Sequence, residues 1–200
     1  MKKIIIAIDS FKGCLTSAEA GKAAEKGIKS INPSCHTSVI PIADGGEGLL
    51  DVLITATKGK YITLSAHGPL MKMAKTHYGL SGNGRTAIIE MAAISGLPLV
   101  PIEQRNPMLT TTFGTGELIK DALNKGCRNF IIGIGGSATN DAGLGMLQAL
   151  GFRFLDKSGH TLGTGGQIME AVANIDTSGI HPALRETHFM VACDVANRSE

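Results

Sequence analysis

The 200-residue sequence contains no tryptophan, and aromatic residues make up only 4% of it. This scarcity argues against a surface that stacks nucleobases or an aromatic cleft for sugars. Nineteen basic against 17 acidic residues leave a formal net charge of +2, and no run of Lys and Arg forms the concentrated basic face that duplex binding needs. We therefore expect no nucleic acid among the partners of this protein.

Long apolar runs and paired cysteines are also missing. The apolar run at residues 4–8 ends at Asp9, far short of a signal peptide or a membrane span. The four cysteines show neither a C-x-x-C pair nor a histidine at ligand spacing, which is typical of small buried thiols in a reducing cytosol. With 43% hydrophobic residues, the sequence predicts a globular, cytoplasmic protein without a membrane partner.

Several catalytic motifs are absent as well. The sequence has no G-x-x-x-x-G-K-[ST] segment and no H-R-D, which excludes the P-loop and the protein-kinase machinery. No serine stands in G-x-S-x-G. A phosphate-binding site must therefore be sought in other glycine-rich loops.

The first 57 or so residues predict a strand–helix–strand–helix unit. The β-branched run at residues 4–8 is typical of a central strand that is covered on both faces. Thr16 and Glu19 have the spacing of a capping box at the start of a helix, and a second strand is expected at residues 39–42. Two strands are too few for a stable sheet. We therefore expect this unit to be completed by strands from beyond residue 200 or by another copy of the chain, as in a homodimer.

From about residue 60 the pattern changes. Short β-like runs and Asn83-Gly84, a strong hairpin signal, predict an antiparallel region up to residue 92. Alternating units follow, and Gly126 is placed to end one of their helices. The chain stops a few residues past a strand of the buried type, which predicts a truncated protein. We expect strands at 61–66, 76–80, 86–91, 130–134, 152–155 and 189–193, and helices at 116–124, 141–150 and 165–173.

Charged side chains follow three of the predicted strands. Because the carboxyl ends of the strands form the ligand crevice in open α/β sheets, residues at these positions carry the most functional information. Carboxylates there suit a hydrated Mg²⁺ ion or a base toward a hydroxyl group, and lysine suits a phosphate or carboxylate. A single Asp is explained equally well as a helix cap or an Asx turn, but three such strand ends together favour a site. The residues are Asp9, Ser10 and Lys12, then Asp44 and Glu47, and finally Asp194.

The segment G-I-G-G-S-A-T-N-D at residues 133–141 lies between a predicted strand and a predicted helix. Glycines permit close backbone approach, and a helix N-terminus presents N–H groups to an anion, so the segment is typical of a phosphate-binding loop. It also matches G-x-G-x-x-A, with Asp156 closing the next strand, which leaves open an NAD-dependent oxidoreductase built from Gly133 to Asp156. The late position in the chain and the acidic Asp141 favour a phosphate or metal–phosphate loop. A third hypothesis is a non-catalytic half that supplies a ligand-binding loop to another chain.

At these residues the chain resembles the glycerate kinase family of type I. The matching segments keep their order and spacing through nearly the whole chain, which is far more specific than one glycine loop. They are D-S-F-K-G at 9–13, A-D-G-G-E-G at 43–48, E-M-A at 90–92, S-G-L at 95–97, R-N-P at 105–107, T-T-T-F-G-T-G-E-L-I at 110–119, G-I-G-G-S-A-T-N-D at 133–141 and C-D-V at 193–195.

The resemblance implies an α/β fold with two lobes and the active site in the cleft between them. Residues 1–59 would form the first part of a flavodoxin-like, Rossmann-like parallel-sheet lobe, and residues 60–200 a second, mixed α/β lobe. Family members are roughly twice this length and continue after the equivalent of Asn197 with a Pro-Leu-x-Gly type segment, so the chain resembles an N-terminal half. The implied activity is ATP-dependent phosphorylation of D-glycerate, with Mg²⁺.

The predicted roles follow from the chemistry of the side chains. Catalytic roles are expected for Asp194, Asp44 and Lys12, and binding of glycerate for Asp9, Ser10, Lys12, Arg105 and Asn106. The phosphates of ATP are assigned to Gly133, Gly135, Gly136, Ser137, Thr139, Asn140, Thr115 and Gly116, and Mg²⁺ to Asp44, Glu47 and Asp141.

Overall fold

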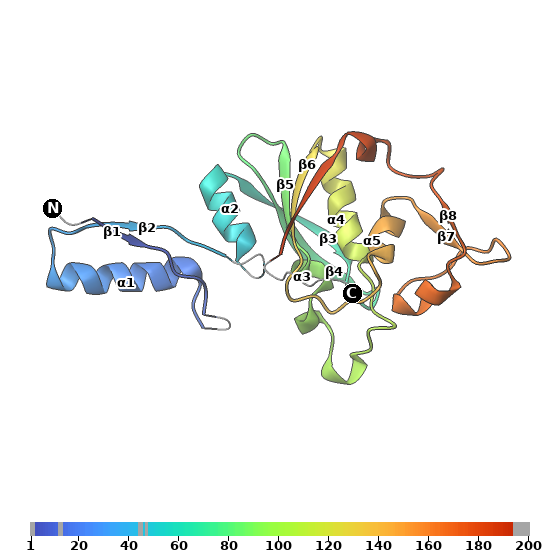
Figure 1. Cartoon of the computed structure of the whole chain (residues 1–200), viewed down its shortest axis with the longest axis horizontal. Helices are drawn as coiled ribbons and strands as arrows, with labels where there is room; N and C mark the ends of the chain where they lie inside the picture. Colours follow the sequence, from blue (N-terminus) through green and yellow to red (C-terminus); the bar gives the residue numbers. More distant parts are fainter. Residues whose placement is uncertain (1–2, 12–13, 44–45, 47, 194–200) are drawn as a thin grey trace, which may run out of the picture.

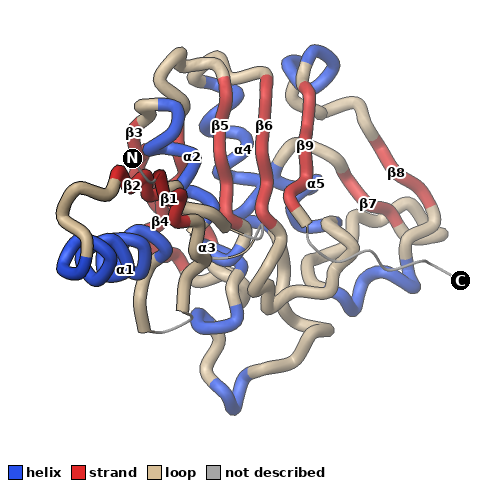
Figure 2. The backbone as a smooth tube through the Cα atoms, turned by 60° about the vertical axis from the view of Figure 1, so that its left-hand side comes forward, coloured by secondary structure: helices blue, strands red, loops and turns tan. Residues whose placement is uncertain are grey.

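The computed structural model describes residues 3–11, 14–43, 46 and 48–193. Its largest element is a five-stranded mixed sheet with the order β3-β4-β5-β6-β9 (Figure 2). One half is antiparallel and the other half is parallel, and β5 belongs to both. The strands are β3 (Lys60–His67), β4 (Met73–Leu80), β5 (Thr86–Glu90), β6 (Asn129–Gly133) and β9 (His188–Ala192).

Helices cover both faces of this sheet. In β5, Ile88 packs against α2 (Leu49–Thr57), whereas Ile89 belongs to the larger core beneath α4 (Phe113–Asn124). Both isoleucines are at most 1% exposed, as expected for a strand whose alternate side chains are buried on opposite faces. The short helices α3 (Ala92–Ser95) and α5 (Leu144–Ala149) pack beside α4.

The remaining elements of this large unit are short. Strands β7 (Arg153–Leu155) and β8 (Asn174–Asp176) pair antiparallel in a sheet of their own. The predicted helix at 165–173 is a 3₁₀ helix, and the one at 141–150 begins only at Leu144. The 3₁₀ helices are η1 (Leu97–Leu99), η2 (Ile102–Gln104), η3 (Gly166–Ala171) and η4 (Pro182–Glu186).

The N-terminal unit is built differently. It consists of β1 (Lys3–Ile6), α1 (Ser17–Ile31) and β2 (His36–Val39), and it extends away from the large sheet (Figure 1). Within the described ranges β1 pairs with β2 alone, in parallel, and Ile5 is 60% exposed. The prediction that this strand is covered on both faces is therefore wrong for the structure described here. Helix α2, which we placed in the same unit, packs instead on β4 and β5. The boundary after residue 59 stays a prediction.

Local signals in the sequence are confirmed. The hydroxyl oxygen of Thr16 accepts the Glu19 amide, and the Glu19 carboxylate accepts the Thr16 amide, as a capping box requires. Asn83 and Gly84 lie in the turn between β4 and β5, where Gly84 has φ +69°. Gly126, with φ +91°, follows the last residues of α4. No helix in the described part of the chain is long and apolar enough to span a bilayer.

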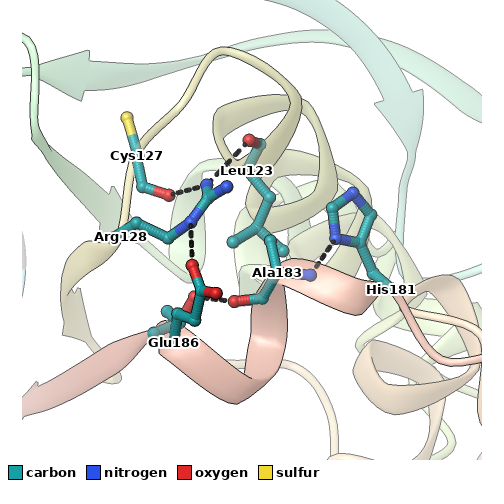
Figure 3. A network of polar contacts seen from close by, with 7 residues as sticks. Leu123, Cys127, Arg128, His181, Ala183 and Glu186 are labelled. Atoms are coloured by element: carbon teal, nitrogen blue, oxygen red, sulfur yellow. Dashed lines mark hydrogen bonds and ion pairs between the residues drawn. The ribbon is translucent and has the colours of Figure 1, made fainter.

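A polar network fixes the edge of the sheet at which β6 begins (Figure 3). The guanidinium of Arg128, just before β6, donates to the carbonyl oxygens of Leu123 and Cys127 at 3.2 and 2.7 Å, capping the end of α4. Its Nε lies 3.9 Å from the Glu186 carboxylate in η4. The network thus ties the start of β6 to the end of α4 and to η4.

Candidate functional site

A cavity of about 270 Å³ lies where β6 ends, between the loop that follows β6 and the segment from η1 to Thr110. Two distant parts of the sequence therefore form its wall. The position agrees with the rule that ligands bind beyond the carboxyl ends of parallel strands. The lining residues are Leu97, Val100, Arg105, Asn106, Pro107, Thr110, Ser137, Ala138, Thr139 and Asn140.

The loop after β6 is held by backbone hydrogen bonds. The Leu97 amide donates to the Gly136 carbonyl at 3.0 Å, and the Ala138 amide donates to the Ser95 carbonyl at 2.8 Å. Gly136 has φ +72°, a left-handed conformation that favours glycine, and an added Cβ there would lie 3.3 Å from Ala92. These contacts hold the loop after β6 against the segment around η1.

Polar groups of both segments face this cavity. The Ser137 and Thr139 hydroxyls lie 2.7 Å apart, and the Thr139 amide donates to the Ser137 oxygen at 3.0 Å. The Nε of Arg105 donates to the Val100 carbonyl at 3.3 Å. The structure thus brings together five of the predicted residues: Arg105, Asn106, Ser137, Thr139 and Asn140.

Asp141, a predicted metal ligand, is only 1% exposed, and its carboxylate already has many hydrogen-bond donors. Its Oδ2 accepts the amides of Thr112 and Gly145 at 2.8 and 3.1 Å, and its Oδ1 accepts the Gly143 amide at 3.1 Å. The hydroxyls of Thr111 and Thr112 add further bonds. The N–H groups at the start of α5, which we expected to face an anion, therefore bind Asp141 instead.

Two predicted ATP-binding residues lie in the core rather than at the cavity. The Thr115 side chain is fully buried, and its hydroxyl lies 2.8 Å from that of Ser95. A Cβ on Gly116 would lie 2.3 Å from the Met146 carbonyl oxygen, so this glycine permits the close packing of α4 on α5. Their positions favour packing roles over ligand contact.

A second cavity, of about 450 Å³, lies between the start of α1, helix α2, His77 in β4 and the end of β5. It includes Ser10, whose amide donates to Asp9 at 2.6 Å, and it includes Glu90. The half-buried Glu90 carboxylate accepts the Leu50 amide at 2.9 Å, and burial raises its pKa. Sequence reasoning gave Glu90 no role, although an acid at the end of a buried strand is the kind of signal that we used for Asp9.

Four of the predicted residues have no described position. Lys12, Asp44, Glu47 and Asp194 lie outside the described residues, and their roles stay predictions. Among the residues that the structure describes, no group of three His, Cys, Asp or Glu side chains is arranged to hold a metal ion.

The geometry does not support the dinucleotide hypothesis. That fingerprint needs its acid at the end of the next parallel strand. Asp156 follows β7, which pairs antiparallel with β8, whereas the parallel neighbours of β6 are β5 and β9. The Asp156 carboxylate accepts the amides of Ser158 and His160 in its own turn, at 2.8 and 2.9 Å.

Comparison with known proteins shows the family of this chain. The sequence model of the glycerate kinase family matches residues 4–198. This chain belongs to the glycerate kinase family. The resemblance noted from the sequence motifs is thereby confirmed.

Relatives in the glycerate kinase family align with nearly the whole of this chain. A glycerate kinase of Bacillus subtilis is 53% identical over 98% of this chain and 51% of the relative, and a glycerate 2-kinase of Escherichia coli is 49% identical over 98% and 51%. The crystal structure of a putative glycerate kinase 2 from Salmonella typhimurium superposes with a TM-score of 0.88 at 48% identity, over 98% of this chain and 52% of that one. The chain thus spans about half the length of the relatives that it matches.

Proposed function

We propose that this chain is part of a glycerate kinase, which transfers a phosphoryl group from ATP to D-glycerate. The observation that carries the proposal is the 53% identity, over 98% of the chain, to a relative named glycerate kinase. A relative named glycerate 2-kinase, at 49% identity, extends the proposal to the hydroxyl group on C2 of glycerate.

The chemistry of the 270 Å³ cavity supports this proposal. Its volume lies just below the range of about 300 to 1,000 Å³ typical of drug-sized ligands, so it suits a three-carbon acid or a phosphoryl group. Arg105 offers a cation for a carboxylate or phosphoryl oxygen, and Ser137 and Thr139 offer hydroxyl donors. Phosphoryl transfer depends mainly on positioning and charge stabilisation, for which such a set of groups is suited.

The described residues that follow β6 suit the phosphates of ATP, whereas two of the proposed Mg²⁺ ligands lie outside the described residues. ATP would supply the transferable phosphoryl group, with its phosphates held by Gly133 at the end of β6 and by Gly135 and Gly136 in the loop that follows. Mg²⁺ is usually bound by one or two carboxylates together with waters and phosphates, so a preformed cluster of three acids is not needed. Asp44 and Glu47 remain the proposed ligands, Lys12 the proposed second cation, and Asp194 or Asp44 the proposed acceptor of the hydroxyl proton.

The two-lobe arrangement completes the proposal. The exposed β1–β2 pair is short of the three strands that an independently stable sheet needs. We propose that it belongs to a flavodoxin-like lobe, which is completed by sequence equivalent to the other half of the relatives or by a second copy of this chain. The active site would then lie between that lobe and the large sheet.

An ADP-release assay with D-glycerate tests the proposal. It compares this chain alone with the chain continued by the second half of the Bacillus subtilis relative. We expect turnover in the longer protein and a fall in kcat/KM of about 10- to 100-fold for Arg105→Ala, the cost of one charged hydrogen bond. Arg153→Ala is the matched control, because Arg153 pairs with Asp176 in the small β7–β8 sheet. Absence of turnover with glycerate in the longer protein would refute the proposed activity.

A further inference from the structure

The buried carboxylate of Asp141 lies close to residues of the 270 Å³ cavity. It is 1% exposed and does not line the cavity, but both segments of the cavity wall pass beside it. On one side its neighbour Asn140 lines the cavity, and on the other side its partner Thr111 is next to the lining residue Thr110. A displacement of Asp141 should therefore shift both walls of the cavity.

Among the residues that the structure describes, the hydrogen-bond donors to this carboxylate are neutral. They are three backbone amides, of Thr112, Gly143 and Gly145, and two threonine hydroxyls. A buried carboxylate without a cation beside it is costly unless its lone pairs are satisfied by hydrogen bonds. The loss of any one donor should therefore leave the buried Asp141 carboxylate with too few hydrogen bonds, at a cost in stability.

These donors belong to the starts of two helices. Thr111 and Thr112 lead into α4, whereas Gly143 and Gly145 begin α5. The Thr112 hydroxyl also accepts the Met146 amide at 2.9 Å, so it bridges the two helix starts. A Cβ on Gly145 would lie 2.0 Å from the Thr111 oxygen, which shows how closely the helices approach each other here.

We infer that Asp141 is a positioning residue, which fixes the separation of the two walls of the cavity and so its fit to the substrate. This inference rests on the proposed function, and it assigns Asp141 a role other than metal binding. A metal ligand needs an oxygen directed at the ion, whereas both oxygens of Asp141 accept backbone amides. The wall itself is joined by the Thr110 hydroxyl, which donates to the Ala138 carbonyl at 2.8 Å.

The substitution Asp141→Asn tests the inference sharply. Either orientation of the carboxamide turns its NH₂ toward a backbone N–H, because each oxygen of Asp141 accepts at least one amide. In the longer protein we expect the KM for glycerate or ATP to rise by about tenfold or more, because one charged hydrogen bond is lost. The Mg²⁺ concentration that gives the half-maximal rate should change less than about twofold. A rise in the Mg²⁺ requirement at constant KM would show instead that Asp141 binds the metal.

Two further variants keep the test decisive if Asp141→Asn does not fold. Thr112→Val removes the bridging hydroxyl and should raise the same KM, whereas Thr112→Ser keeps the hydroxyl and should restore it. Asp156→Asn is the matched control, because Asp156 also accepts two backbone amides but does so in a distant turn. Equal KM values for the Val and Ser variants would overturn the inference.

A measurement without substrate separates this inference from the proposed function. Amide hydrogen exchange on this chain should be slow at Thr112 and Gly145 and at least about tenfold faster in Asp141→Asn or Thr112→Val. The increase should extend to Thr139, which lines the cavity. If exchange at Thr139 is unchanged, Asp141 does not position the wall, whatever the enzyme activity proves to be. If exchange responds but glycerate is not phosphorylated, only the proposed function fails.

Discussion

Two isoleucines from similar β-branched runs are in opposite environments. Ile89 in β5 is fully buried, whereas Ile5 in β1 is 60% exposed. The large unit covers both faces of its central strands with helices, and the N-terminal unit covers little of its two strands. Apolar sequence thus specifies a strand, but whether that strand is covered depends on the elements around it.

The largest difference between the two units should appear on truncation of these side chains. We expect Ile89→Ala to lower the free energy of unfolding by about 3 to 4 kcal/mol, because it leaves a cavity in a packed core. Ile5→Ala should cost less than about 1 kcal/mol, since most of that side chain is already in water. Urea unfolding of both variants measures the difference. Equal losses would mean that Ile5 is buried in solution, by another copy of the chain or by other means.

Replacing a glycine inside a helix by alanine should change the free energy of unfolding in opposite directions in the two units. A Cβ on Gly145 in α5 would lie 2.9 Å from the Asp141 Oδ2 as well as close to Thr111, so Gly145→Ala should destabilise by about 1 to 3 kcal/mol. A Cβ on Gly27 in α1 meets nothing within 4 Å, so Gly27→Ala should stabilise by about 0.5 to 1 kcal/mol. Thermal and urea unfolding test both signs. Destabilisation by Gly27→Ala would show that this face of α1 is packed.

The two units should also differ in the direction of their pH dependence. Burial raises the pKa of Glu90 above 4.5, so the folded state holds this proton more tightly than the unfolded state does. The stability that Glu90 contributes is therefore present below pH 4.5 and decreases as the pH rises through the raised pKa. The carboxamide oxygen of Glu90→Gln can still accept the Leu50 amide. The stability of this variant relative to the wild type should accordingly increase from below pH 4.5 to about pH 7.

Glu19 should show the opposite slope. Hydrogen bonds from the Thr16 amide and hydroxyl lower the pKa of its carboxyl below 4.5. Its contribution is present above pH 4.5 and is lost as the pH falls through the lowered pKa, so Glu19→Gln should lose stability relative to the wild type toward pH 7. Urea unfolding of both variants at the two pH values measures the slopes. Slopes of the same sign would contradict the assigned environments.

The smallest effects should be alike in the two units. Lys29 pairs with Glu25 in α1, and Lys125 pairs with Asp121 at the end of α4, both with i,i+4 spacing and with lysines that are 49% and 44% exposed. Lys29→Ala and Lys125→Ala should each change the free energy of unfolding by less than about 0.5 kcal/mol, because exposed ion pairs contribute little. A loss above about 1 kcal/mol for Lys125→Ala alone would show that it also supports the Tyr78–Asp121 hydrogen bond.

Sequence reasoning succeeded where the signal was local. The capping box needs only Thr16 and Glu19, and the turn at Asn83-Gly84 depends on backbone freedom within a few residues. Arg105 and Ser137, which we assigned to a site from the sequence, line the same cavity, and their roles stay predictions. Sequence reasoning did not predict the surroundings of Asp141, because several of its hydrogen-bond donors belong to Thr111 and Thr112, about 30 positions earlier in the chain. The exposure of Ile5 was missed for a similar reason, since burial depends on which segments pack around a strand.

The mixed character of the large sheet has a consequence for the order in which it forms. Leu80 pairs with Ala87 and Lys60 with Leu80, so the antiparallel half needs only short chain closures. Asn129 pairs with Thr86 and with His188, which are far apart in the sequence, so the parallel half forms only after long crossover connections have closed. We expect residues 60–90 to form a meander early, with β5 then acting as the template on which β6 and finally β9 assemble. During synthesis, strands β3, β4 and β5 would thus be paired before β6 and β9 leave the ribosome. Pulse-labelled hydrogen exchange during refolding should show protection of β4 before β9.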